Sequence, residues 1–343
     1  MTDVYRKFNA WKIVLPTVIG MGVVAYMFFK EFDLEQIRQM DFTWQMAFWI
    51  FIALCFMLGR DIGFVIRYRY LTEKQLSWKQ CIKITLLAEF GTAITPSSVG
   101  GSSMAVLFLA KEHVPVGRST AMVFVTMLLD EMFFVAAFPI LLLFLPIEEL
   151  FADTSAFGTS VIILFIAAYT IKIALCIFLI TGLFFKPQAV RWLIIKVFRL
   201  PFLRRWHKGA VKAGDDLIVS SQEIRGKDFS FWFPLIVATI LSWCSRYLVV
   251  NAILMAFFPA YDNLLIFARQ FIMWVVMIVS PTPGGSGFSE FIFQQYLSEF
   301  IPLAGVVPLV ILIWRLLTYY NYLFVGALIV PAWIKKAFRP EKG

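Results

Sequence analysis

Charged residues lie inside long apolar stretches of this 343-residue sequence, where each needs a partner, water or a bound ligand. The candidates for a binding site are Arg60, Asp61, Glu89, Asp130, Glu131, Arg246, Arg269, Glu290 and Arg315. Guanidinium groups suit phosphate, which they bind through two parallel hydrogen bonds, whereas carboxylates suit amines and hydroxyls. The set therefore predicts a site for a headgroup that carries a phosphate together with an amine or a hydroxyl. Structural ion pairs between helices are the alternative for each single residue.

Two segments rich in Pro, Gly and Ser interrupt the apolar regions 79–111 and 264–299. The first reads Thr-Pro-Ser-Ser-Val-Gly-Gly-Ser at 95–102, and the second reads Ser-Pro-Thr-Pro-Gly-Gly-Ser-Gly at 280–287. Such residues break a helix, and irregular backbone at membrane depth needs cover from protein or a water-filled cavity. Each region is therefore predicted to be a re-entrant helical hairpin.

The tips of these hairpins have two alternative uses. Helix N-termini after the paired glycines expose N–H groups that suit phosphate. Small residues in membranes also serve close helix packing, which is their commoner use. The tip residues in question are Pro96, Gly100, Gly101, Ser102, Pro283, Gly284, Gly285 and Ser286.

The composition favours an all-α polytopic membrane protein, formed as one membrane domain over residues 1–343. Hydrophobic residues make up 60% and charged residues 15% of the chain, against about half and about a quarter in soluble domains. A membrane-crossing helix takes about 20 apolar residues. Six full spans are predicted, at 11–29, 44–66, 121–145, 158–185, 229–257 and 306–334. The first run is too long for a signal peptide and is expected to remain as a span.

Basic residues place the segment 186–228 on the cytoplasmic side, because Lys and Arg favour the inner loops. It carries ten basic and four acidic residues, so it holds 10 − 4 = +6 of the chain's net charge of +9. The connection 67–79, which follows the second predicted span, and the tail from Lys335 onward are basic too, which puts both termini inside. The stretch 186–212 interleaves cations with apolar residues, which predicts an amphipathic connection lying on anionic lipid. Nucleic acid is the disfavoured partner.

The two halves of the chain space their charges and helix breakers alike. Arg60 precedes Pro96 by 96 − 60 = 36 positions, and Arg246 precedes Pro283 by 283 − 246 = 37 positions. Broken helices in matching positions of an inverted repeat indicate a midplane binding site with alternating access around it. We therefore predict an inverted-topology repeat, with its first unit at 11–145 and its second at 158–334.

No metal or cofactor is expected. The two His and four Cys lack metal-ligand spacing, and no G-x-x-x-x-G-K-[ST] motif for ATP is present. The competing function is a membrane-embedded lipid-modifying enzyme, with Glu89 or Asp130 as acid/base and Ser97, Ser98 or Ser102 as nucleophile. This hypothesis is weaker because a serine needs a base within reach, and no histidine lies in the apolar core. An ion channel or a scaffold is a third alternative.

Several of these residues together resemble a known family. The pattern consists of Arg60, Thr95-Pro-x-x-x-Gly-Gly, Asp130-Glu131, Pro281-Thr-Pro-Gly-Gly-Ser-Gly and Arg315-Leu-Leu-Thr. Over about residues 11–336 it is similar to the transmembrane domain of bacterial lysylphosphatidylglycerol synthase/flippase proteins and their stand-alone relatives. The resemblance implies movement of an aminoacylated phospholipid between leaflets. Because the chain has no room for a soluble synthase domain, the resemblance implies translocation without synthesis.

Together these observations predict a flippase-like lipid translocase of the bacterial cytoplasmic membrane, and not an enzyme. Its substrate is expected to be a polar or aminoacylated phospholipid or a lipid-linked headgroup. The arginines are expected to bind phosphate, and the acids to meet amines or hydroxyls. The lipid, the energy source and the oligomeric state stay open, with a homodimer among the options.

Overall fold

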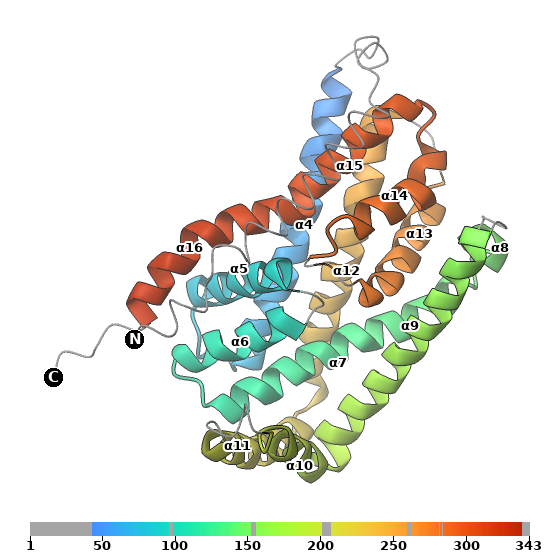
Figure 1. Ribbon diagram of the computed structural model, residues 1–343. Helices are drawn as coiled ribbons and strands as arrows, with labels where there is room; N and C mark the ends of the chain where they lie inside the picture. Colours follow the sequence, from blue (N-terminus) through green and yellow to red (C-terminus); the bar gives the residue numbers. More distant parts are fainter. Residues whose placement is uncertain are drawn as a thin grey trace.

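The computed structural model describes residues 43–95, 99–151, 156–200, 207–258, 262–280, 282 and 284–337. These residues form helices joined by short turns, and no strand occurs among them (Figure 1). The fold is therefore all-α, as the composition predicts. The first predicted span, at 11–29, lies outside the described residues.

Five stretches of the described chain are long and apolar enough to cross a membrane. They are Trp44–Leu71, Val116–Leu141, Gly158–Phe185, Phe229–Phe257 and Ala304–Val330. The helices that build them are α4 (Trp44–Leu71), α7 (Val116–Leu141), α9 (Ala156–Ile180), α12 (Phe229–Phe257), α15 (Val307–Arg315) and α16 (Asn321–Ala337). The π-helical turns Thr181–Phe185 and Leu316–Tyr320 extend α9 and join α15 to α16. Each stretch overlaps one of the spans predicted from the sequence.

Helix α4 corrects one prediction about the inner loop. It continues five residues beyond the predicted end at 66, to Leu71. Arg67, which the charge pattern assigned to the cytoplasmic connection, therefore lies in the helix and is 2% exposed. Arg67 can be buried there because its guanidinium forms an ion pair with the carboxylate of Asp130, on the neighbouring helix α7.

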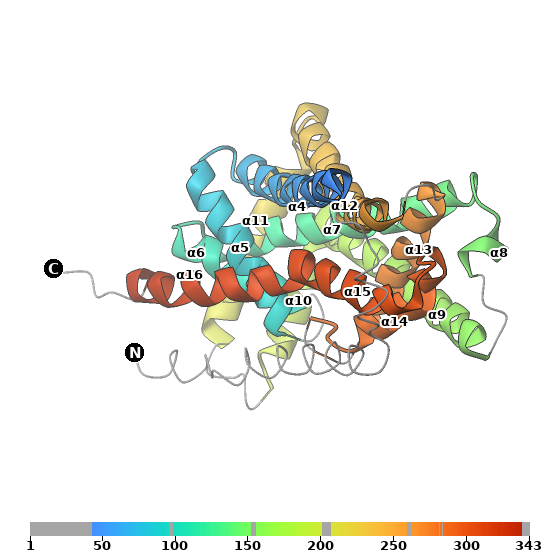
Figure 2. The same cartoon turned by 90° about the horizontal axis from the view of Figure 1, so that it is seen from above.

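Helices α4 and α12 pack against each other in antiparallel directions through small residues (Figures 1 and 2). A Cβ at Gly63 would lie 2.1 Å from the Ser242 hydroxyl oxygen, and one at Gly59 would lie 3.1 Å from that of Ser245. The Ser242 hydroxyl also donates a hydrogen bond to the Arg60 carbonyl at 3.0 Å. The absence of a Cβ at Gly63 is thus what lets the two backbones approach.

The first interrupted region forms two helices, α5 (Trp78–Ile94) and α6 (Val99–Lys111). Ser77 and Gln80 form a capping box at the start of α5. At 17 and 13 residues, both helices are shorter than the roughly 20 residues of a full crossing. The two helices pack so closely that a Cβ at Gly101 would lie 1.9 Å from the Thr92 hydroxyl oxygen. The predicted helix–break–helix arrangement is confirmed.

The second interrupted region behaves alike. Helix α13 (Asn263–Val276) continues into the 3₁₀ turn Met277–Val279, and α14 (Phe288–Leu297) follows the break. Within the break, Gly284 and Gly285 have φ of 58° and 69°, a left-handed conformation that glycine adopts without strain. In both views the pair α5–α6 lies on one side of the molecule and α13–α14 on the other (Figures 1 and 2).

The remaining helices lie at the ends of the long ones. The short α8 (Ile147–Leu150) precedes α9. Helices α10 (Pro187–Val197) and α11 (His207–Arg225) pack on each other at the foot of Figure 1, and α11 also packs on α7. They occupy most of the basic connection 186–228, and Trp192 of α10 is 59% exposed. Binding of this connection to anionic lipid stays a prediction.

Candidate functional site

The two helix breakers touch each other. The backbone N–H of Gly284 donates a hydrogen bond to the carbonyl oxygen of Thr95 at 3.3 Å. Tyr319, in the π turn between α15 and α16, bridges the same breakers. Its hydroxyl accepts from the Ser286 hydroxyl at 3.1 Å and donates to the Ala93 carbonyl at 3.2 Å. The break of the second interrupted region therefore lies directly against the end of α5, where the first break begins.

Arg60 holds three helices together near this contact. It is 2% exposed, and its guanidinium donates to Asp61 at 2.8 Å, to Glu89 of α5 at 2.5 Å and to the Tyr322 hydroxyl of α16 at 2.8 Å. The Tyr322 hydroxyl donates in turn to Asp61 at 2.7 Å. One cation thus faces two carboxylates, which leaves a formal negative charge in the cluster. The Asp61 and Glu89 side chains remain 22% and 19% exposed, so a ligand can reach them.

Asp130 belongs to a separate pair with Arg67. The two guanidinium nitrogens of Arg67 donate to the Asp130 carboxylate at 2.5 and 3.1 Å, and one also reaches the Thr126 carbonyl at 2.9 Å. The indole N–H of Trp243 on α12 donates to the same carboxylate at 2.8 Å. Sequence reasoning missed Arg67. Its spacing of seven residues from Arg60, two helical turns, is the signal that would place both on one face of α4.

Glu131 points to a different helix from its neighbour Asp130. Its carboxylate pairs with the Lys172 ammonium of α9 at 3.1 Å, and that ammonium lies 3.8 Å from the Phe134 ring centroid. The 100° turn between consecutive helical residues predicts this divergence. Lys172 is 6% exposed and was also missed, although its isolation within the apolar stretch 158–185 marks it as a charge in need of a partner.

Arg315 is held by Glu290 at the start of α14. The guanidinium lies 2.8 Å from the carboxylate, whose side chain is 0% exposed. The second carboxylate oxygen accepts from the Gly287 N–H and the Ser289 hydroxyl, both at 2.8 Å. The Tyr319 ring stacks 3.9 Å from the guanidinium. These contacts are those of a structural ion pair, the alternative that the sequence left open for this residue.

Arg269 lies apart from the other candidates. Its guanidinium forms an ion pair with Glu299 and donates to the carbonyls of Glu149 at 3.0 Å and Tyr296 at 3.3 Å. Glu149 belongs to α8, at the edge of the molecule in Figure 1. The structure therefore places Arg269 in a peripheral joint between α8, α13 and α14, away from the meeting point of the breakers.

Arg246 has no carboxylate partner within the described part of the chain. Its guanidinium stacks on the Trp274 ring at 3.8 Å and lies 6.0 Å from that of Trp243. Its buried Nε finds no hydrogen-bond partner among the described residues. It is close enough to Arg60 and Glu89 to interact electrostatically with both. A cation in this state is available to a bound anion.

Other predicted site residues are placed as follows. Pro96 and Pro283 lie outside the described residues. Gly101 serves helix packing, because Thr92 occupies the space of its Cβ. Gly285 is buried, and a Cβ there would lie 2.2 Å from the Met277 side chain. The described part of the chain holds no group of three or more His, Cys, Asp or Glu that could bind a metal ion.

Fold and site define an all-α membrane protein in which buried ion pairs surround two broken helices. The chain belongs to the family described as the lysylphosphatidylglycerol synthase TM region, which matches residues 13–326. It is similar to a UPF0104 membrane protein of Archaeoglobus fulgidus, with 26% identity over 308 residues that cover 84% of each chain. No solved structure matches the chain. The resemblance read from the sequence is confirmed, and the protein is a multi-pass membrane protein.

Proposed function

We propose that this protein translocates a phospholipid or a lipid-linked headgroup across the cytoplasmic membrane, with both termini in the cytoplasm. The observation that carries the proposal is Arg246, a cation within a membrane-crossing helix that has no acid partner in the described structure. A charge at such depth is costly unless water or a ligand compensates it. The phosphate diester is the anion common to phospholipids, and it matches the bidentate geometry of a guanidinium.

The Arg60 cluster supplies the complementary charge. Its two carboxylates outnumber its one guanidinium, and both remain partly exposed. An amine of an aminoacylated headgroup would therefore be attracted to Asp61 and Glu89 while the phosphate binds Arg246. Because Glu89 interacts electrostatically with Arg246, one headgroup can engage both sides of the site.

The contact between the breakers supports a gating role for the hairpins. The Gly284–Thr95 hydrogen bond and the Tyr319 bridge join elements from the two halves of the chain. In alternating access, one such contact closes the path on one side of the site and opens in the other state. Few and neutral hydrogen bonds suit this task, because separating them costs only about 0.5–1.5 kcal/mol each.

The lipid-modifying enzyme is the less favoured function. Glu89 and Asp130, the acids that such an enzyme would use, are each engaged by an arginine at 2.5 Å. A general base needs a free lone pair directed at the proton it removes. One oxygen of Glu89 is thus paired with Arg60 while the cluster keeps its net negative charge, which favours electrostatic binding of a cationic headgroup over proton transfer.

Translocation is tested in proteoliposomes with lipids that carry a fluorescent acyl chain. The panel contains lysyl-phosphatidylglycerol, phosphatidylglycerol and a neutral glycolipid, which offer phosphate with amine, phosphate alone, and neither. A reductant confined to the outside reports the fraction in each leaflet. We expect the fastest exchange for lysyl-phosphatidylglycerol and none above protein-free vesicles for the glycolipid. Exchange at the protein-free rate for all three would overturn the proposal, and a mass change in the recovered lipid would favour the enzyme.

A further inference from the structure

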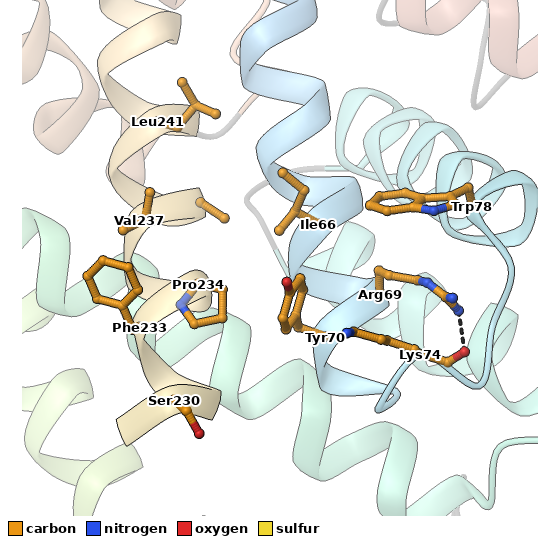
Figure 3. Close-up of a pocket in the computed structure, with 11 residues that line it drawn as sticks. Ile66, Arg69, Tyr70, Lys74, Trp78, Ser230, Phe233, Pro234, Val237 and Leu241 are labelled. Carbon is orange, nitrogen blue, oxygen red and sulfur yellow. Dashed lines mark hydrogen bonds between the residues drawn. The ribbon is translucent and has the colours of Figure 1, made fainter. Parts of the chain in front are cut away.

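A groove of about 780 Å³ lies between the last turns of α4, the first turns of α12 and the start of α5 (Figure 3). Its polar end is formed by Arg69, Lys74, Tyr70 and Trp78. The rest of the groove is apolar, and its walls include Val237 and Leu241 of α12. Figure 3 shows these two side chains on α12, higher in the view than Arg69 and Lys74. The groove thus has the polarity of a lipid molecule, charged at one end and apolar along its length.

The charge at the polar end is positive and uncompensated. No acid is among the residues that line the groove. The neighbouring Glu73 pairs instead with Arg118 at 2.8 Å and with Lys227 at 3.0 Å. The Lys74 ammonium makes no ion pair within the described structure, and it lies 5.4 Å from the Tyr70 ring centroid. Its positive charge is therefore free to attract an anion.

Arg69 makes the polar end rigid. Its guanidinium donates to the carbonyl oxygens of Lys74 and Leu76, and the first of these bonds is drawn in Figure 3. It also lies 5.7 Å from the Trp78 ring centroid. These bonds fix the turn after α4, where Lys74 has a φ of 62°. The turn is held in a left-handed conformation that keeps Lys74 beside the groove.

The groove opens towards the bilayer. Phe233, Val237 and Leu241 are 55%, 46% and 40% exposed in a helix that crosses the membrane. Trp78 is exposed beside them, and tryptophan favours the level of the lipid headgroups. The groove is separate from the Arg60 cluster, because Gly63 packs so closely on Ser242 and Ala238 that even a Cβ does not fit between them.

We propose that this groove binds an anionic phospholipid from the adjacent leaflet. Its phosphate lies at Lys74 and Arg69, between Trp78 and Tyr70, and its acyl chains follow Val237 and Leu241 of α12. A phospholipid matches both ends of the groove, whereas a free anion matches only the cations. The proposal requires the chain to lie in a membrane, but it does not depend on translocation.

The test uses the full chain in nanodiscs of phosphatidylcholine with a small share of phosphatidylglycerol whose acyl chain is photoreactive. After illumination, mass spectrometry of peptides locates the labelled residues. We expect labelling to concentrate on residues 229–241 and to fall roughly fivefold in Lys74→Gln, which removes one basic charge near the membrane surface. Lys79→Gln is the matched control, because Lys79 is exposed on the first turn of α5 and does not line the groove. Labelling in this variant is expected to equal that of the wild type.

Two results would overturn the proposal. The first is equal labelling of 229–241 by photoreactive phosphatidylcholine, which would reduce the groove to ordinary lipid-facing surface. The second is unchanged labelling by phosphatidylglycerol in Lys74→Gln. Because binding is measured without transport, either result leaves the translocation proposal to its own assay.

Discussion

The backbone N–H of Gly284 donates to the Thr95 carbonyl across 284 − 95 = 189 positions of sequence, at 3.3 Å. This bond joins the break of one helical hairpin to the break of the other. The Tyr319 hydroxyl lies beside it and bonds to Ser286 in one break and to Ala93 in the last turn of α5, just before the other break. Three neutral hydrogen bonds therefore hold the meeting point of the breakers, while the ion pairs around it fix the helices that carry them.

Removal of the Tyr319 hydroxyl tests the bridge. Tyr319→Phe leaves the Ala93 carbonyl without its donor, so we expect a loss of about 1–3 kcal/mol in unfolding free energy and a lower thermal midpoint in detergent. Tyr247→Phe is the control, because the buried Tyr247 hydroxyl has no hydrogen-bond partner among the described residues. Its midpoint should stay unchanged or rise. Equal effects of the two substitutions would show that the bridge contributes nothing.

The seam between α4 and α12 is tested by two alanine substitutions one helical turn apart. Gly63→Ala places a Cβ 2.1 Å from the Ser242 hydroxyl oxygen and 2.5 Å from the Ala238 carbonyl, and the backbone cannot move aside. We expect a loss of about 1–3 kcal/mol, read as a lower midpoint and yield. Gly59→Ala meets only the rotatable Ser245 hydroxyl at 3.1 Å and should be tolerated. Tolerance of both would contradict the close packing.

The pair of Arg315 and Glu290 predicts an effect on folding. Arg315→Ala leaves a fully buried carboxylate unpaired, so we expect a loss of about 3–5 kcal/mol and little extracted protein. Arg315→Met combined with Glu290→Gln removes both charges and should restore part of the yield. Size-exclusion profiles of detergent extracts provide the measurement. A normal yield of Arg315→Ala would mean that water or lipid compensates Glu290.

The orientation is tested by single cysteines on a background without the four native ones. Gly209→Cys lies on α11 with nothing within 4 Å of its Cβ, and Glu148→Cys lies exposed on α8. With intact cells and a membrane-impermeant maleimide, we expect label on Glu148→Cys alone, and on Gly209→Cys only after lysis. The reverse pattern would invert the topology that the basic connection predicts.

The sequence predicted the helices well because the signals for them are local. The length of an apolar run decides whether it can cross a bilayer, and clustered Pro and Gly residues interrupt a helix. The breaks in 79–111 and 264–299 follow from this chemistry. The antiparallel seam of α4 and α12, two helices in matching positions of the halves, is the packing expected of an inverted repeat, which itself stays a prediction.

The pairing of charges could not be predicted, because partners are chosen by tertiary packing. Arg67 looks like a loop residue next to a basic connection, and only the position of Asp130 on α7 explains its burial. Arg269 looks like a site residue until its contacts with Glu149 and Glu299 are seen. Single charges in apolar segments therefore predict that a partner exists, but not which residue or ligand it is.

Arg246 provides the most direct test of the proposed function. Arg246→Gln leaves no acid unpaired in the described structure and loses only the stacking on Trp274, which is worth about 0.5–2 kcal/mol, so the variant should still fold. Arg191→Gln is the control, since Arg191 forms an ion pair with Asp215 between α10 and α11 in which both side chains are partly exposed. In the proteoliposome assay, we predict that Arg246→Gln lowers the leaflet exchange of lysyl-phosphatidylglycerol at least about tenfold, the equivalent of a lost charge-assisted hydrogen bond. Arg191→Gln should exchange at the wild-type rate, and wild-type exchange by well-folded Arg246→Gln would contradict a role of Arg246 in binding the lipid phosphate.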